Sequence, residues 1–420
     1  MHSLAEFTEK SLTAFHARDN LAKILSENSF AELKETEEWK IEKGGKYYVS
    51  RNGSSLIAFK AGEYLSFNIV ASHADSPCFK LKNNPEIKTE NYVKYNVERY
   101  GGGIFYSWLD RPLKVAGRVI VEKDGKLTAK TFVSEKTVVI PSVAIHFNRT
   151  ANDGIKLNPQ VDMCPIAGLD GNGDIAEELA KFAGDGKVAD CDLYLVSDQK
   201  PFYSGYKGEL LSSPRIDNLS SALSSADALI NCDAKAFPVV FVADNEEVGS
   251  STKQGAGSKF LYDVLKRIAE CYAGNIDVAL ANSFMLSFDN AHAVHPNHAE
   301  LSDPTNKVTL GGGIVIKHHA GQNYTTDGFS SAIAKKIFDA AGAKYQDFYM
   351  RSDLPCGGTL GAISSGNVSI KCADIGLPQL AMHSAVETMA VSDYEEGLKG
   401  ITAFLSARII SDGDKTTEIL

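Results

Sequence analysis

Residues 237–250 read FPVVFVADNEEVGS, an apolar run that ends in two adjacent glutamates, Glu246 and Glu247. A short apolar run rich in Val and Phe is typical of a strand buried on both faces. Two carboxylates side by side at the end of such a strand repel each other unless a cation or a proton neutralises them. The stretch therefore predicts a buried strand that ends beside something positive.

The sequence around this stretch predicts an α/β fold. From residue 208 onward, short apolar segments alternate with helical ones, which favours a mixed or largely parallel sheet covered by helices. Near the N-terminus, the spacing predicts one amphipathic helix over 4–26 and a strand over 64–71.

Residues 85–205 have a different texture, because Val, Tyr, Phe and Thr alternate with polar residues there. Within them, VIVEKDGKLTAKTF (119–132) predicts a hairpin with a turn at its Asp-Gly pair. A chain of 420 residues is long for one core. We therefore expect a discontinuous catalytic domain of residues 1–84 and 206–420, with a β-rich domain of residues 85–205 inserted between its halves.

Composition excludes several classes of partner. The net charge is −10, from 43 basic and 53 acidic residues, so nucleic acids and anionic membranes are unexpected partners. The chain has neither a signal peptide's apolar core nor an apolar run of the roughly 20 residues that a membrane span needs. Its seven cysteines are scattered without a CxxC pair. They fit a reducing cytoplasm, where we expect the protein to act.

Acids and histidines gather where the predicted strands end, and each has an ordinary structural alternative. Asp217, before a Leu/Ala-rich helix, could be an N-cap. Asp75 could be a turn residue, and His383 a core histidine. Pro296 argues against a zinc-binding helix through the three histidines that surround it. The residues of this set are His73, Asp75, Asp217, Glu246, Glu247, Asp289, His292, His295, His298 and His383.

Together these residues favour a two-metal site. Two divalent ions held about 3.5–4 Å apart need a bridging carboxylate and further ligands on each ion. Two imidazoles and three carboxylates meet that need, in His73, Asp217, Glu247, Asp289 and His383. Glu246 is left over as a general base, and Asp75 can orient the ring of His73. Zinc is the expected metal, with cobalt or manganese as alternatives.

Over about residues 70–390, the order and wording of the motifs resemble the aspartyl aminopeptidase family of co-catalytic zinc exopeptidases. The segments that carry the resemblance are SHADSP (72–77), IPSVAIHFNR (140–149), LNPQVDMCPIAG (157–168), RIDNLSSA (215–222), ADNEEVGS (243–250), FDNAHAVHPN (288–297), GIVIK (313–317), NYTTD (323–327), DLPCGGTLGAISS (353–365) and PQLAMHSAVE (378–387).

The resemblance implies an activity and an architecture. It implies removal of one N-terminal amino acid from peptide substrates, with Asp or Glu favoured. The implied fold is a zinc-exopeptidase-like domain with a central mixed sheet covered by helices, plus the inserted β-rich dimerisation domain. The implied assembly is a homo-oligomer, a tetrahedral dodecamer built from dimers.

The resemblance also assigns roles to particular residues. It implies that His73 and Asp289 hold one metal, that Glu247 and His383 hold the other, and that Asp217 bridges the two. Glu246 would be the base, and Asp75 would orient His73.

Four further residues would bind substrate. Lys317 would attract an acidic side chain, while Tyr324 and His292 would line the pocket. His146 would reach into a neighbouring subunit's site, although its alternating flanks alone favour a strand.

Three alternatives stay open at the level of sequence. One is the same chemistry with a neutral, Leu-like preference, because HHAGQNY (318–324) and DLPCGGTLG (353–361) depart from the family's usual wording near the pocket. Another is a different two-metal hydrolase, such as a deacylase or carboxypeptidase. The last is a non-enzymatic assembly or cargo protein, against which the intact set of ligands and base argues.

Overall fold

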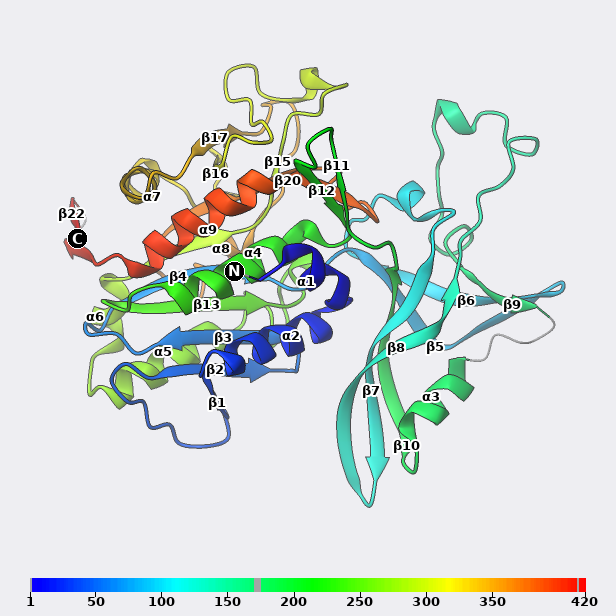
Figure 1. The fold of residues 1–420 in the computed structure, drawn as a ribbon, viewed down its shortest axis with the longest axis horizontal. Coiled ribbons are helices and arrows are strands. Elements are labelled where there is room, and N and C mark those ends of the chain that lie inside the picture. Colours follow the sequence, from blue (N-terminus) through cyan, green and yellow to red (C-terminus); the bar gives the residue numbers. More distant parts are fainter. Residues whose placement is uncertain (1, 170–174, 414) are drawn as a thin grey trace.

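The structure of the protein, a computed structural model, describes residues 2–169, 175–413 and 415–420. A nine-stranded sheet lies at its centre (Figure 1). In spatial order its strands are β1 (Ala31–Leu33), β2 (Lys46–Arg51), β3 (Ser55–Lys60), β13 (Phe237–Ala243), β4 (Phe67–His73), β14 (Phe284–Phe288), β18 (Lys371–Gly376), β16 (Ile314–His318) and β17 (Tyr345–Tyr349).

The middle of this sheet is parallel and its flanks are mixed, which confirms the predicted α/β class. β13, β4, β14 and β18 run parallel in succession, whereas β3 and β16 join them antiparallel. The strand predicted over 64–71 begins later, at Phe67, and continues to His73. The register pairs Ala243 with His73, so the strand ends that carry polar residues lie at one edge.

Both faces of the central strands are buried, as the continuous apolar runs predict. Along β13, Val240 and Val242 belong to one core, and Val239 and Phe241 belong to the other. Burial of each such side chain contributes on the order of 1.5–3 kcal/mol. The central strands are therefore rigid supports for whatever follows their ends.

The helices lie on the two faces of this sheet and around it, except α3, which packs against β10 (Lys187–Ser197) of a second sheet (Figure 1). They are α1 (Leu4–Lys10), α2 (Ala14–Glu27), α3 (Ile175–Ala183), α4 (Ile216–Asn231), α5 (Phe260–Cys271), α6 (Ile276–Ala281), α7 (Gly328–Ala341), α8 (Leu360–Ser364) and α9 (Val391–Ser406). The prediction of a single helix over 4–26 was wrong, because the first helix ends at Lys10 and a second one begins at Ala14. Ser11 leaves the helical region, and Thr13 is the extended N-cap of α2.

A six-stranded antiparallel sheet stands apart from the central one, on the right of Figure 1. Its spatial order is β8 (Lys126–Val138), β7 (Leu113–Lys123), β10 (Lys187–Ser197), β5 (Cys78–Thr89), β6 (Tyr92–Tyr100) and β9 (Ile166–Leu169). The hairpin predicted over 119–132 is present, with Lys123 paired to Lys126 across its turn. Asp124 and Gly125 both have positive φ, which the predicted turn type requires.

Two smaller sheets complete the fold. The five-stranded one contains β11 (Phe202–Ser204), β12 (Leu210–Ser213), β20 (Glu387–Ala390), β19 (Pro378–Leu380) and β15 (Ala291–His292). A hairpin of β21 (Ile409–Asp412) and β22 (Thr416–Ile419) follows α9. In the described part of the chain, no helix is long and apolar enough to cross a membrane. All seven cysteines are free.

His16 on α2 makes the fold sensitive to acid. Burial, and then the positive charge of Arg215, lower the pKa of His16 to about 4. An unfolded histidine titrates near pH 6.5, so the unfolded chain binds the proton first as the pH falls. The contribution of the neutral His16 ring to the stability of the fold is therefore complete above pH 6.5 and is lost as the pH falls from 6.5 to 4.

We expect His16→Gln to remove part of this sensitivity. For the wild type, the His16 contribution to the free energy of unfolding should fall by roughly 2–3 kcal/mol between pH 7.5 and 4.5. Urea denaturation of both chelator-treated proteins at the two pH values measures the difference, because other acid effects are shared. Equal losses in both proteins would contradict the assignment.

Candidate active site

The polar edge of the central sheet collects four of the predicted residues. His73 ends β4, Glu246 and Glu247 follow β13, and Asp289 follows β14. Because these strands are parallel neighbours in register, their carboxyl ends bring the four side chains to one place. Two of the four, His73 and Asp289, are 1% and 9% exposed.

Two other elements complete the cluster. Asp217 lies at the first turn of α4, where its own backbone and that of Asn218 are not helical. The N-cap of α4 is Arg215, so the alternative that Asp217 is a capping residue was wrong. His383 lies between β19 and β20, with a left-handed backbone at φ +68°. Its imidazole ring is about one-third exposed, whereas the Asp217 carboxylate is buried.

Asp217 is central to the geometry, because its two oxygens face different histidines. Its Oδ1 lies 3.5 Å from His73 Nε2, and its Oδ2 lies 3.5 Å from His383 Nε2. His73 Nε2 is also 3.3 Å from Asp289 Oδ1, and His383 Nε2 is 3.5 Å from Glu247 Oε2. Two groups of three possible ligand atoms therefore share one carboxylate. A third group joins His73 to Glu246 and Glu247.

The cluster holds more negative charge than its own groups neutralise. Burial, opposed by the charge of His73 and reinforced by the charges of Asp289, Asp75 and Asp217, raises the pKa of Glu246 to about 8. Burial and then the charge of Asp217 raise the pKa of Glu247 well above its usual value. Two buried oxygens, Asp217 Oδ1 and Glu247 Oε1, have no hydrogen-bond partner among the residues that the structure describes. Buried acceptors of this kind need a proton or a cation.

The two histidines present the same nitrogen to the cluster. His73 Nδ1 lies 3.1 Å from the backbone oxygen of Asp75, and His383 Nδ1 lies 3.1 Å from that of Gly102. A carbonyl oxygen only accepts, so each Nδ1 carries the proton and donates it. Burial opposes protonation of both rings, but the carboxylates around them raise the pKa of His73 and of His383, so a proton or a cation is favoured at each Nε2. In the neutral ring, Nε2 is a lone pair that faces the cluster, which is the arrangement of a metal-binding histidine.

Asp75 supports the cluster more broadly than the sequence suggested. Its Oδ1 and Oδ2 accept hydrogen bonds from the backbone N–H groups of Glu246 and Glu247, both at 3.1 Å. Its Oδ1 also lies 3.4 Å from His73 Nδ1. One carboxylate thus fixes the backbone of both glutamates beside the histidine.

Sequence reasoning missed the contribution of residues 100–102, at the end of β6. Tyr100 donates its hydroxyl hydrogen to Asp75 Oδ2 at 2.7 Å and accepts a bond from Asn245 Nδ2 at 2.8 Å. Gly101 has φ +73°, and a Cβ there would lie 3.1 Å from Glu247 Cβ. The backbone oxygen of Gly102 accepts the hydrogen bond from His383 Nδ1. The only sequence signal was the run of three glycines at 101–103, which indicates a close backbone approach.

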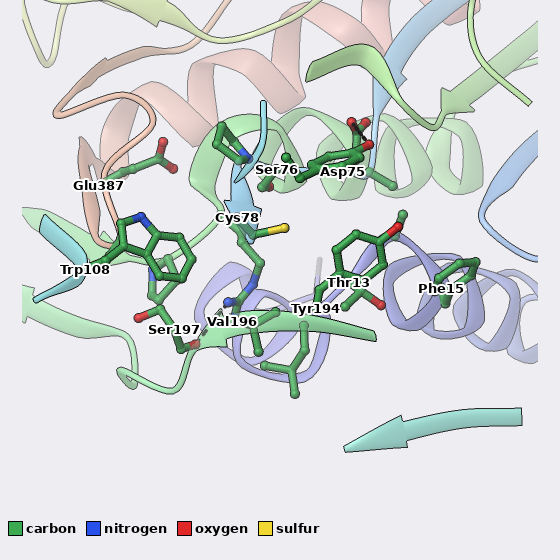
Figure 2. A pocket seen from close by; sticks show the side chains of 18 of the residues that line it. Thr13, Phe15, Asp75, Ser76, Cys78, Trp108, Tyr194, Val196, Ser197 and Glu387 are labelled. Atoms are coloured by element: carbon green, nitrogen blue, oxygen red, sulfur yellow. Dashed lines mark hydrogen bonds between the residues drawn. The ribbon is translucent and has the colours of Figure 1, made fainter. Parts of the chain in front are cut away.

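A small pocket of about 50 Å³ lies behind the cluster, between α2, β10 and the start of β5. Figure 2 shows Asp75 and Glu387 on its upper side, with Cys78, Trp108 and Tyr194 around it. Glu387 belongs to the quoted segment 378–387 but was given no role. Burial, and then the charge of Asp217, raise its pKa to about 8.

Lys317 and Tyr324 lie next to the cluster, and both are buried. Lys317 Nζ donates to the backbone oxygen of Asn290 at 2.9 Å and lies 3.8 Å from Asp289 Oδ2. The ammonium group is also 5.3 Å from the centre of the Tyr324 ring. Lys317 is therefore a buried cation that already faces one of the candidate ligands.

The remaining predicted histidines are not among the grouped ligands. His292, at the end of β15, has an exposed side chain but borders the cluster. Burial of its ring nitrogens and then the charge of Lys317 lower its pKa, and the charges of Asp217 and Asp289 oppose this. His295 and His298 follow it in an irregular segment, as Pro296 indicated. His146 is exposed in a loop eight residues after β8 ends at Val138. The strand that its alternating flanks favoured there was wrong, because the loop leaves the sheet at Val139 and turns at residues 145–147.

The donor set fits zinc. Imidazole nitrogen and carboxylate oxygen are its usual protein ligands together with thiolate, and borderline metals accept both. In each of the three groups, one possible ligand atom from every residue lies within 4.8 Å of the others.

Comparison with known proteins agrees with this donor set. A profile described as the aminopeptidase I zinc metalloprotease family, M18, matches residues 7–405. The "probable M18 family aminopeptidase 2" of Clostridium novyi is 43% identical over 422 residues, which cover 96% of this chain and 98% of that protein. The "probable aspartyl aminopeptidase" of Ricinus communis is 33% identical and covers 96% of this chain and 94% of its own length.

A solved structure shows the same fold. The S. cerevisiae mApe1 dodecamer superposes with a TM-score of 0.82 at 26% identity, covering 96% of this chain and 95% of that one. The profile spans nearly the whole sequence, including every strand of the central sheet. The chain belongs to the M18 family of zinc metalloaminopeptidases, a family of hydrolases.

Proposed function

We propose that this aminopeptidase uses two zinc ions that share Asp217. His73 and Asp289 would hold one ion, and Glu247 and His383 would hold the other. The observation that carries the proposal is the position of Asp217, whose two oxygens face two histidines 3.5 Å away on either side. Bound zinc supplies Lewis-acid polarisation of the peptide carbonyl and lowers the pKa of water toward neutrality.

Glu246 is the base in this proposal. It belongs to neither of the groups centred on Asp217 and is grouped instead with His73 and Glu247. Its Oε2 lies 4.0 Å from His73 Nε2, so its carboxylate reaches the cluster from the side. From this position Glu246 can take a proton from water and return it to the leaving amine. Asp75 holds its backbone in place for that transfer.

The surrounding carboxylates also explain the action at N-terminal residues. A free α-amine carries a positive charge near neutral pH and is attracted by Glu246, Glu247 and Asp289, whereas an acylated amine is neutral. The site therefore favours a peptide with a free N-terminus.

We further propose a preference for an N-terminal Asp or Glu. A buried cation, Lys317, lies at the edge of the site, and the relative from Ricinus communis is named an aspartyl aminopeptidase. Rates on Asp-, Glu-, Leu- and Lys-arylamides and on an N-acetylated control, measured beside zinc content, test both parts. Fastest cleavage of the Leu substrate would favour the neutral alternative, and release of acetate from the acetylated control would favour a deacylase.

The two adjacent glutamates should respond differently to the same substitution. We expect Glu246→Gln to keep its zinc and to lose at least about 10²-fold in kcat, because an amide cannot act as the base. Glu247→Gln should instead lose zinc, because an amide is a poorer ligand. Elemental analysis and steady-state kinetics decide the matter. Zinc loss in the first variant, with full activity in the second, would reverse the roles.

The acid preference is tested at Lys317. If its ammonium attracts the substrate, Lys317→Met should lower kcat/KM on Asp substrates by about 10-fold or more relative to Leu substrates. Zinc content must be measured in parallel, because Lys317 also lies 3.8 Å from Asp289. Equal losses on both substrates, accompanied by zinc loss, would show that Lys317 supports the metal site instead.

We propose that the inserted sheet and its loops mediate assembly into dimers and, through them, a dodecamer. The six-stranded sheet begins at Cys78, seven residues before the expected boundary at 85. The loop around His146 exposes Val143, Ile145 and Phe147, the last at 88%. Exposed apolar side chains of this size usually mark a protein interface. The S. cerevisiae relative is a dodecamer.

In this assembly, His146 would complete a neighbour's active site. We expect His146→Ala to keep its zinc and oligomer size while kcat/KM falls sharply. After subunit exchange with Glu246→Gln, about a quarter of the pockets should combine an intact base with an intact His146 under random pairing in dimers. The same exchange with a variant that carries both substitutions is the control. Proven exchange without recovered activity would contradict a shared site.

A further inference from the structure

Glu387 holds the backbones of two candidate metal ligands at once. Its Oε2 accepts the N–H of Asp217 at 2.9 Å, and its Oε1 accepts the N–H of His383 at 2.7 Å. Glu387 is 2% exposed and lies deep at the pocket beside Trp108 (Figure 2). Its carboxylate therefore joins two segments that are far apart in the sequence.

The five-stranded sheet places Glu387 between these two segments. Its register pairs Glu387 on β20 with Ser213 at the end of β12, four residues before Asp217. In the other direction, Glu387 follows His383 by four residues. The strand pairing thus brings the carboxylate to both N–H groups without any help from a metal.

His383 needs such a restraint. Its backbone has φ +68°, in the left-handed region that costs roughly 1–2 kcal/mol for a residue with a side chain. It has no glycine's freedom to adopt that conformation. The hydrogen bond from its N–H to Glu387 holds the backbone of His383, and the hydrogen bond from its ring to Gly102 holds the side chain.

A buried polar chain extends the same support to the third ligand segment. Gln379 Nε2 donates to Glu387 Oε1 at 3.4 Å, and Gln379 Oε1 accepts from Asn290 Nδ2 at 2.7 Å. Asn290 follows Asp289 directly, and its side-chain oxygen also accepts from Ser220 at 3.0 Å. Two hydrogen bonds thus connect Glu387 to the side chain of Asn290, the residue after Asp289.

From these contacts we infer that Glu387 is a positioning residue, which sets the distance between Asp217 and His383 and thereby the zinc affinity of the site. It mirrors Asp75, whose carboxylate holds the N–H groups of Glu246 and Glu247. The inference rests on the proposed zinc ligands and adds a residue that touches neither metal nor substrate.

Substitution by glutamine tests the inference with little change of shape. Every partner of the Glu387 carboxylate is a donor, so the new NH₂ group must face at least one N–H. Loss of a metal site's supporting hydrogen bonds commonly lowers affinity by about 10–100-fold. We expect Glu387→Gln to weaken zinc binding by that factor, and to recover most of its kcat when zinc is in excess.

Asp393→Asn is the matched control. Asp393 is another fully buried carboxylate that accepts two backbone N–H groups, those of Gly311 and Gly313, both at 2.8 Å. Both variants leave a buried N–H unsatisfied and should lose Tm to a similar extent in their zinc-free forms. Only Glu387→Gln should show a smaller rise in Tm on adding zinc, which follows zinc affinity.

The zinc dissociation constants and the zinc-induced shifts in Tm decide the outcome. Zinc affinity of Glu387→Gln equal to that of the wild type, or an equal loss in Asp393→Asn, would overturn the inference. If Glu387→Gln fails to fold, Glu387→Asp, one methylene too short to reach both N–H groups, must show the same loss of affinity. Unchanged zinc binding in His383→Gln would instead overturn the metal assignment itself.

Discussion

The site depends on one constraint. Several carboxylates are buried around Asp217, and the positive groups near them do not neutralise all of their negative charge. Burial opposes the charge of Asp217, but the His383 and His73 rings beside its carboxylate lower its pKa overall. Glu246 and Glu247 beside it have raised pKa values, because burial and their neighbours oppose their charge. A cluster of this kind stores unfavourable electrostatic energy that a bound cation releases. The rigid strands under it are what keep the carboxylates from moving apart.

Two pairs of hydrogen bonds hold this geometry, and they come from different parts of the fold. Asp75 holds the end of β13, and Glu387 joins α4 to the segment before β20. Tyr100 and Gly102 reach the same site from the six-stranded sheet, through Asp75 and His383. The inserted sheet is therefore in direct contact with the catalytic cluster within one subunit. Any contact between subunits through that sheet acts on a part of the protein that already touches the site.

Much of this site could be predicted from sequence, because strand ends in a parallel sheet converge. His73, Glu246, Glu247 and Asp289 follow buried apolar runs, so their proximity needed only the sheet order. The local sequence around Asp217 is that of a helix N-cap. The two histidines that lie beside Asp217 in the fold are distant in the sequence, so the local segment gives no sign of them. Glu387 and Tyr100 were missed for a related reason. Their partners are backbone N–H groups and a supporting carboxylate, and such contacts leave no residue pattern.

Lys317 shows why specificity is harder to infer than chemistry. Its ammonium lies 3.8 Å from Asp289 and donates to a backbone oxygen, so part of its charge is already compensated. A substrate carboxylate drawn to Lys317 must share that charge with Asp289, a proposed zinc ligand. A cation bound to the Asp289 carboxylate neutralises part of its negative charge and weakens its attraction for Lys317. The Lys317 ammonium then attracts a substrate carboxylate more strongly. In this arrangement the proposed acid preference depends on zinc occupancy, although Lys317 itself binds no metal.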